Sequence, residues 1–146
     1  MPTTSELESL YRDLHEHPEL PFEEHRTAGI IADRMRALGL ETTTGIGGTG
    51  VVAVLRNGDG PTVWLRADMD GLPVEEKTGL DYASTVIFTT PSGITTPVMH
   101  ACGHDMHVTW LIGAIEELVA SRATWSGTVV AVFQPAEELL AGARAM

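Results

Sequence analysis

The chain has 146 residues, of which 43% are hydrophobic and 20% charged, a composition typical of a folded globular domain and not of a disordered chain. Nine basic against twenty acidic residues give a formal net charge of −11. A surface of that sign repels phosphate backbones, which excludes nucleic acid as a partner. The absence of a signal-peptide pattern and of a run of ~20 apolar residues predicts no membrane partner. The single cysteine is typical of a reducing compartment, so we expect a cytoplasmic protein.

Two amphipathic helices are predicted at the N-terminus, because apolar residues recur there at helical spacing. The first should end before Pro18, and the second should run over residues 23–38 and stop at Gly39. The apolar residues of these two segments are Leu7, Leu10, Tyr11 and Leu14, followed by Ala28, Ile31, Met35 and Leu38.

Two short apolar runs, 51–55 and 62–65, are predicted to be strands. The sequence Asn-Gly-Asp-Gly between them is a strong turn signal, which favours a hairpin. A third run, 128–133, is continuously apolar and is typical of a strand in the middle of a sheet. Just before the first strand, GIGGTG (45–50) matches the dinucleotide pattern G-x-G-x-x-G. That pattern needs a helix after it, and a strand follows here, so we interpret it as a turn or bulge.

Two aspartates follow the strand 62–65. In open α/β sheets the carboxyl ends of strands face the ligand crevice, so Asp68 and Asp70 either point into a site or cap a turn with Gly71. Residues 77–98 then form a long polar connection, in which Ile87 and Phe88 can make a short strand. A loop of that length inside a compact domain is commonly functional or mobile.

The stretch 97–108, PVMHACGHDMHV, holds the only cysteine and three of the six histidines. A thiolate beside imidazoles suits zinc or a similar divalent ion, whereas a lone cysteine is often only a small buried hydrophobe. Cys102 and His104 are two residues apart and cannot share one face of a regular helix. They can converge on one ion if the backbone is irregular before the helix predicted over 108–119 begins.

Two adjacent glutamates, Glu137 and Glu138, follow the strand 128–133. Neighbouring side chains point in different directions, so one carboxylate can bind a metal while the other takes a proton from water. A pair of acids decorating a helix start is the alternative. Together with the Cys/His stretch, the pair favours a metallohydrolase over a scaffold in which Cys102 is merely buried.

Four motifs in this order carry a resemblance to a known family: LHEHPELPFEE (14–24), LRADMDGLPVEEKTG (65–79), MHACGHDMHVTWLIGA (99–114) and GTVVAVFQPAEE (127–138). The chain resembles the amidohydrolase branch of metallopeptidase family twenty, which includes N-acyl-amino-acid amidohydrolases, hippurate hydrolases and auxin-conjugate hydrolases. The resemblance implies an α/β fold, the three-layer, mixed-sheet catalytic domain of a zinc-peptidase-like fold. It also implies two divalent ions (zinc, manganese, cobalt or nickel).

By the same resemblance, Cys102, His104 and Glu138 are metal ligands, with the thiolate bridging, Glu137 is the general base and Asp70 supports the site. The implied reaction is hydrolysis of the amide bond of an N-acyl amino acid or peptide-like substrate. A dipeptidase or deacetylase of the superfamily, or an inactive truncated metal-binding fragment, is the alternative. Family members are longer, with further histidine ligands and a lid domain that mediates dimerisation. We therefore expect residues 1–146 to be the N-terminal portion of the catalytic domain, with the lid absent, and the full-length protein to be a homodimer.

Overall fold

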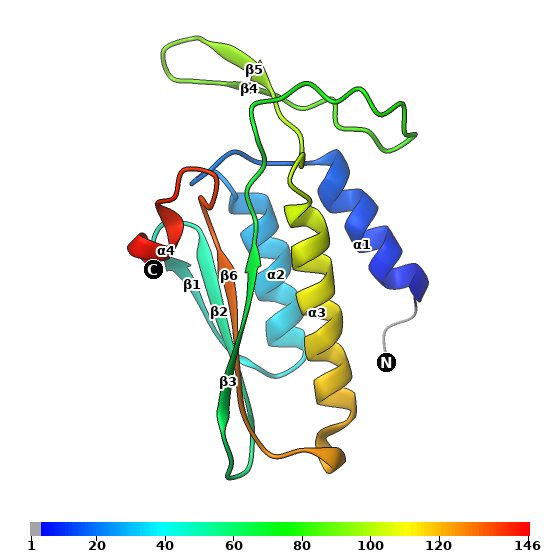
Figure 1. Cartoon of the computed structure of the whole chain (residues 1–146), viewed down its shortest axis with the longest axis vertical. Helices are drawn as coiled ribbons and strands as arrows, with labels where there is room; N and C mark the ends of the chain where they lie inside the picture. The colour runs from blue at the N-terminus through cyan, green and yellow to red at the C-terminus, as the bar shows by residue number, and fades with distance from the viewer. Residues whose placement is uncertain (1–3) are drawn as a thin grey trace.

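Three helices lie on one side of a four-stranded sheet in the computed structural model, which describes residues 4–146 (Figure 1). The strands and helices before residue 70 are α1 (Thr4–Glu16), α2 (His25–Ala37), β1 (Glu41–Ile46), β2 (Gly50–Asn57) and β3 (Thr62–Asp68). Those after it are β4 (Ile87–Thr89), β5 (Thr95–Pro97), α3 (His104–Ala120), a short 3-10 helix (Arg122–Thr124), β6 (Gly127–Gln134) and α4 (Gly142–Ala145). Both predicted N-terminal helices and the helix after the Cys/His stretch are confirmed. No helix in this described range is both long and apolar enough to cross a membrane.

The sheet is mixed, and its order is β1-β2-β6-β3. β6 pairs antiparallel with β2 and parallel with β3. The predicted hairpin between 51–55 and 62–65 is therefore wrong, because β6 is inserted between the two strands. The prediction that 128–133 is a central strand is confirmed.

The turn after β2 is held to the start of β6, which explains the insertion. The Asn57 side-chain amide donates hydrogen bonds to the carbonyls of Arg122 (2.8 Å) and Trp125 (2.6 Å). The N–H of Thr128 donates to the carbonyl of Pro61 at 2.9 Å. A Cβ on Gly60 would lie 2.9 Å from the Cα of Gly127. The glycine-rich turn thus makes room for β6 and does not close a two-stranded hairpin.

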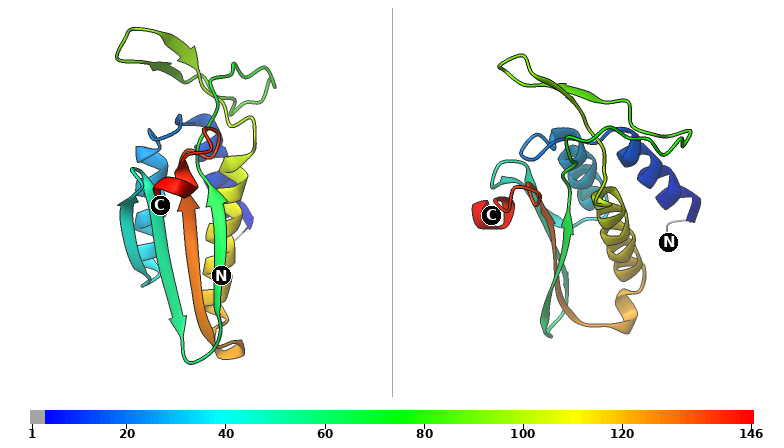
Figure 2. Two further views of the ribbon diagram at one scale, coloured as in Figure 1. Left: turned by 60° about the vertical axis from the view of Figure 1, so that its left-hand side comes forward. Right: turned by 45° about the horizontal axis from the view of Figure 1, so that its top comes forward.

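The core lies between the sheet and the helices, whose position Figure 2 shows in two further views. Alternate residues of β2 and β6 point toward the helices and are fully buried, as expected for the period of two of a strand. The largest completely buried apolar side chains include Phe133 from β6, Val51 and Leu55 from β2, Ile31 and Met35 from α2, and Ile112 and Ile115 from α3. The mixed α/β class is confirmed. Of the three expected layers, residues 4–146 form the sheet and one helical layer.

The GIGGTG segment joins β1 to β2 in an antiparallel hairpin, with an irregularity in the register between Thr44 and Ile46. Gly45, Gly47 and Gly48 all have positive φ angles (77°, 62° and 111°), which only glycine adopts without cost. The interpretation of this segment as a turn with a bulge, and not as a nucleotide site, agrees with its geometry.

Candidate metal centre

The carboxyl ends of β3 and β6 lie side by side at one end of the sheet, next to the first turn of α3. Asp68 is in register with Gln134, and the N–H of Met69 continues the parallel pairing by donating to the Gln134 carbonyl at 3.1 Å. Parallel strands deliver the residues that follow them to the same edge. Asp70 and the Glu137–Glu138 pair therefore meet at the N-terminus of α3, where His104 is the first helical residue.

His104 is buried and has a different partner on each ring nitrogen. Its Nδ1 lies 2.9 Å from the Asp70 carbonyl and 3.2 Å from the Asp70 carboxylate. Because both of these groups are acceptors, Nδ1 carries the proton, and Nε2 is left with its lone pair in the neutral ring. Nε2 lies 3.8 Å from the Glu137 carboxylate and 4.0 Å from the Glu138 carboxylate. A lone pair facing two carboxylates is stabilised only if a cation or proton lies between them.

The structure brings His104, Glu137 and Glu138 together, with ligand atoms within 4.8 Å of one another. The Glu138 side chain is 17% exposed and that of Glu137 is 31% exposed. One oxygen of Glu138, Oε1, is buried and has no hydrogen-bond partner. Burying an unpaired carboxylate oxygen is costly, so this orphaned atom and the oriented His104 ring fit a bound divalent cation.

Asp70 connects His104 to the loop that carries Glu137 and Glu138. Its carboxylate is fully buried, faces His104 Nδ1 and accepts the backbone N–H of Glu138 at 3.0 Å. Burial raises the pKa of Asp70, but the hydrogen bonds from His104 and from the backbone of the glutamate pair outweigh it and lower the pKa below its ordinary value. Asp70 is therefore an ionised anchor that positions both His104 and the glutamates. Its carboxylate therefore contacts His104 and the backbone of Glu138, and neither of these contacts caps a turn with Gly71.

Substituting Asp70 with asparagine should lower the pKa of His104. Burial by itself lowers that pKa, and the hydrogen bond to the Asp70 carboxylate reverses the effect and raises it above 6.5. An NMR titration of the metal-free protein should show the His104 ring titrating at lower pH in Asp70→Asn than in the wild type. Asp13→Asn, on the exposed face of α1, is the control and should leave His104 unchanged. An unaltered His104 pKa in Asp70→Asn would contradict this account.

The loop that carries the glutamates is fixed from the other side by Glu24, a fully buried residue at the start of α2. Its carboxylate accepts the N–H of Ala136 at 2.9 Å and the hydroxyl of Thr49. Ala136 has φ 48°, a conformation that a non-glycine residue adopts only when its surroundings hold it there. Glu24 was not singled out from the sequence, because its partners lie 25 and 112 residues away.

Cys102 is exposed and lies in the turn before α3, so the backbone is irregular there, as convergence with His104 requires. It is in neither of the groups whose ligand atoms all lie within 4.8 Å. A hydrogen bond to the Glu138 carboxylate, partial burial and the nearby acids raise the pKa of Cys102 to about 11. The thiol thus faces the cluster from its rim, and a thiolate there needs a neighbouring cation.

His107 and His100 differ sharply from each other. His107 lies 3.6 Å from the Asp68 carboxylate, and Asp68, His104 and His107 form a second group with ligand atoms within 4.8 Å. The resemblance gave no ligand role to His107. The structure therefore adds His107 to the residues that could hold a metal ion, beside Cys102, His104 and Glu138. His100 is buried with both ring nitrogens unpaired, and burial lowers its pKa to about 4. The His100 ring is therefore uncharged at neutral pH.

A buried cluster behind the centre was missed by the sequence reasoning. His15 on α1 lies 2.6 Å from Asp105 through Nδ1 and 3.1 Å from Glu76 through Nε2. Asp105 follows His104 directly, so His15 links α1 and the segment after β3 to the start of α3. The available signal was the place of His15 directly after Leu14 on the apolar side of α1, where a buried imidazole needs a partner.

A histidine oriented by a carboxylate and facing two further carboxylates, at the strand ends of a mixed sheet, is typical of the metal sites of α/β proteins. The model of peptidase family M20/M25/M40 matches residues 64–146, more than half of the chain. The chain belongs to this family.

Three relatives illustrate the similarity. The chain is 46% identical over 129 residues to thermostable carboxypeptidase 1 of Saccharolobus solfataricus, covering 87% of this chain and 30% of that protein. It is 43% identical over 142 residues to hippurate hydrolase of Campylobacter jejuni, covering 97% of this chain and 34% of that protein. The crystal structure of Bacillus subtilis YXEP, a dinuclear metal binding peptidase of the M20 family, superimposes with a TM-score of 0.85 at 42% identity and covers 97% of this chain and 38% of that one. The chain thus spans about a third of the length of these relatives.

Proposed function

We propose that residues 1–146 form part of the catalytic domain of a metal-dependent amidohydrolase that cleaves the amide bond of N-acyl amino acids. The observation that carries the proposal is the His104 ring, whose Nδ1 faces Asp70 while Nε2 faces Glu137 and Glu138. This is the arrangement in which a carboxylate fixes the tautomer of a metal-ligating histidine. The family membership, and the dinuclear metal binding of the B. subtilis relative, support two divalent ions.

His104, Glu138 and Cys102 are the proposed ligands. Glu138 offers the buried oxygen that has no other partner, and the Cys102 thiol adjoins the same carboxylate. Thiolate, imidazole and carboxylate together suit zinc and its neighbours in the first transition row. A bound divalent ion supplies Lewis acidity, which polarises the amide carbonyl and acidifies water.

Glu137 is the proposed general base. It is the more exposed carboxylate of the pair, which suits the group that meets the attacking water. It accepts a proton from the water that attacks the amide carbonyl, and it returns that proton to the leaving amine. Asp70 keeps His104 and the backbone of Glu138 in place throughout, through the contacts on each of its oxygens.

The experiment uses the protein as its gene encodes it, stripped of metal with a chelator and then supplied with zinc, manganese, cobalt or nickel. We expect hydrolysis of N-acetyl and N-benzoyl amino acids to disappear with the metal and to return with it. Faster cleavage of dipeptides than of every N-acyl amino acid would instead favour a dipeptidase, consistent with the carboxypeptidase among its relatives. Metal binding without hydrolysis of any of these compounds would contradict the proposed activity and indicate a protein that only binds metal.

A further inference from the structure

The glycine-rich turn at residues 45–50 contains a buried threonine. Thr49 is 4% exposed, and its hydroxyl donates a hydrogen bond to the carboxylate of Glu24, 25 residues away. The same turn packs against α4, because a Cβ on Gly47 would lie 2.8 Å from the carbonyl carbon of Ala145. Figure 1 shows α4 beside the turn between β1 and β2. The turn is therefore joined both to the start of α2 and to the chain that follows the glutamate pair.

Glu24 is a buried carboxylate whose two oxygens have different partners. One oxygen accepts the Thr49 hydroxyl, and the other accepts the N–H of Ala136 at 2.9 Å. Burial raises the pKa of Glu24, and its hydrogen bonds oppose this effect only in part. Burying a carboxylate is costly unless hydrogen bonds compensate it, so both donors are needed to offset that cost. Glu24 therefore fixes the positions of the Thr49 side chain and of the Ala136 backbone relative to each other.

Ala136 is the residue at which the chain turns from β6 toward the metal centre. Its φ of 48° lies in the left-handed region, which a non-glycine residue occupies only when its surroundings hold it there. Its N–H is held by Glu24, and its carbonyl accepts the N–H groups of Ala141 (3.3 Å) and Gly142 (3.1 Å). The peptide groups on both sides of this unfavourable torsion are therefore fixed.

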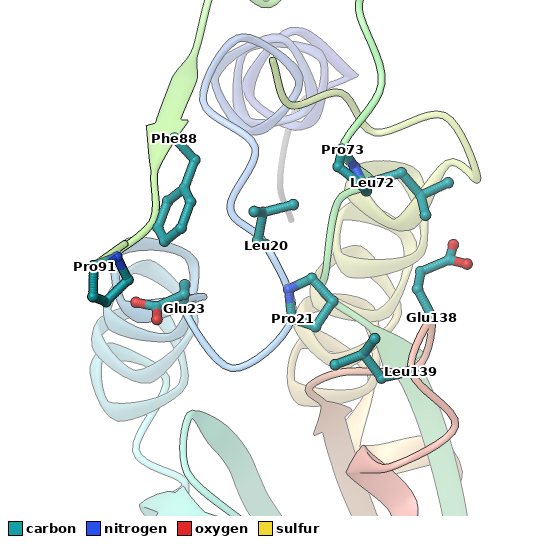
Figure 3. Close-up of a pocket in the computed structure, with 9 residues that line it drawn as sticks. All are labelled: Leu20, Pro21, Glu23, Leu72, Pro73, Phe88, Pro91, Glu138 and Leu139. Carbon is teal, nitrogen blue, oxygen red and sulfur yellow. The ribbon is translucent and has the colours of Figure 1, made fainter. Parts of the chain in front are cut away.

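The two residues after Ala136 are the glutamates, whose carboxylates lie 3.8 and 4.0 Å from Nε2 of His104. An extended φ at Ala136 would change the direction of the chain and move both carboxylates away from that nitrogen. The connection between α1 and α2, which leads to Glu24, adjoins the same loop at the surface. Pro21 and Leu139 line one pocket there together with the second glutamate of the pair (Figure 3).

We propose that Glu24 is a positioning residue of the metal centre, which holds Ala136 in the left-handed conformation that directs the glutamate pair toward His104. Thr49 of the glycine-rich turn in turn fixes the Glu24 carboxylate. The proposal rests on the function proposed above and adds two residues that lie outside the proposed ligand set. Because the conformation of Ala136 sets the place of both glutamates, zinc affinity and the placement of the proton acceptor both depend on Glu24.

Three substitutions separate the hydrogen bonds of Glu24 from its charge and its volume. Glu24→Gln keeps a carbonyl oxygen for the N–H of Ala136, and its amide can donate to the Thr49 hydroxyl. Glu24→Met keeps the approximate volume and removes both acceptors. Thr49→Val removes only the hydroxyl. Glu23→Gln is the matched control, because Glu23 is the preceding residue, receives the same substitution and has a side chain that is 51% exposed.

The experiment uses the protein as its gene encodes it. It measures hydrogen exchange at the Ala136 amide without metal, then zinc affinity, and then kcat and KM at saturating zinc. In Glu24→Met we expect exchange at least about tenfold faster, zinc binding about tenfold weaker, and kcat at least about tenfold lower with KM within about twofold. Thr49→Val should show the same changes at about threefold, and Glu24→Gln should stay within about threefold of the wild type. Glu23→Gln should match the wild type.

Ala136→Gly provides a readout that a merely structural role of Glu24 would not move. Glycine adopts a positive φ without cost, so adding Ala136→Gly to Glu24→Met should recover at least about threefold in zinc affinity. Ala136 is completely buried, and removing its methyl group would not relieve a variant whose only defect is a loosened core.

Wild-type exchange, zinc affinity and kcat in Glu24→Met and Thr49→Val would overturn the positioning role. Equal losses in Glu24→Gln and Glu24→Met, or no recovery with Ala136→Gly, would also overturn it. If Glu24→Met does not fold, Thr49→Val decides, and wild-type values in that variant overturn the proposal. In each of these cases the wild type still binds zinc and hydrolyses N-acyl amino acids, so the proposed function survives. A wild type that binds zinc and hydrolyses no N-acyl amino acid would overturn the function, while exchange and zinc affinity still decide the role of Glu24.

Discussion

Replacing Glu137 with glutamine should lower kcat/KM for amide hydrolysis by about 10²–10⁴-fold and leave the affinity for divalent ions within about twofold. Glutamine keeps the shape of the side chain but cannot accept the proton of the attacking water. The side chain is 31% exposed, so it contributes little to the fold, and the stability should not change. Steady-state kinetics and metal titration of the same preparation provide both readouts.

Glu138→Gln is the matched comparison, because the two residues are adjacent and the substitution is the same. It should weaken metal binding at least about tenfold, because it removes the charge of a partly buried carboxylate whose Oε1 is buried without a hydrogen-bond partner. Opposite results, with metal lost in Glu137→Gln and retained in Glu138→Gln, would exchange the two roles. Equal loss of metal in both variants would show that both carboxylates are ligands and that the base lies elsewhere.

The His15→Gln variant should be destabilised by about 3 kcal/mol near pH 6. His15 lies between Asp105 and Glu76, and all three side chains are almost completely buried. Both ring nitrogens face carboxylates at hydrogen-bond distance, so both carry protons and the ring is an imidazolium. Removing one member of a buried ion pair leaves its partners as uncompensated charges, which costs about 3–5 kcal/mol. Urea unfolding measures the difference.

The same cluster predicts a pH dependence of stability. Burial opposes the charged form of His15, but the hydrogen bonds from the ring to Glu76 and Asp105 raise its pKa above the unfolded value of 6.5. The imidazolium therefore contributes its full stabilisation below about pH 6.5, and the contribution is lost as the pH rises through the higher folded pKa. Tyr11, Tyr82 and His100 are the other titratable side chains that adjoin this cluster. Tyr11 titrates well above this range, with a pKa raised to about 12, and the pKa of His100 is lowered to about 4.

The difference between the unfolding free energies at pH 6 and pH 9 should therefore be smaller in His15→Gln than in the wild type, and the part that remains comes from His104, whose pKa is also raised. His25→Gln is the control, because His25 has a side chain that is 74% exposed, and it should retain the wild-type pH dependence. A pH dependence that persists unchanged in His15→Gln would contradict the imidazolium assignment.

Local patterns predicted the parts of the fold that local interactions determine. Helix periodicity located α1, α2 and α3, and the position of Asp70 after an apolar run located one end of the sheet. The wrong prediction of a hairpin between β2 and β3 concerns a pairing that distant residues determine. Asn57 and Gly60 make a turn in either arrangement, and the choice between pairing β2 with β3 and inserting β6 depends on contacts with residues near Gly127, which no local pattern reports.

The candidate metal centre likewise has residues that the sequence motifs predicted and residues that they did not. The motif-based set gave Cys102, His104, Glu137 and Glu138, and the chain fold brings the last three together. The supporting contacts of Glu24 and His15 were not predicted, because each bridges segments distant in sequence, up to 112 residues apart for Glu24. Buried charged side chains reveal their partners only in three dimensions.

Cobalt titration of the metal-free protein tests the proposed ligand set. We predict tight binding, with an absorption band of cobalt–thiolate charge transfer and release of the Cys102 proton. The band should disappear in Cys102→Ser, and the affinity should fall at least about tenfold in His104→Ala and Glu138→Gln, while His107→Ala retains it. Wild-type affinity and spectrum in the Cys102, His104 and Glu138 variants, with loss in His107→Ala, would contradict the assignment and locate the metal at Asp68 and His107.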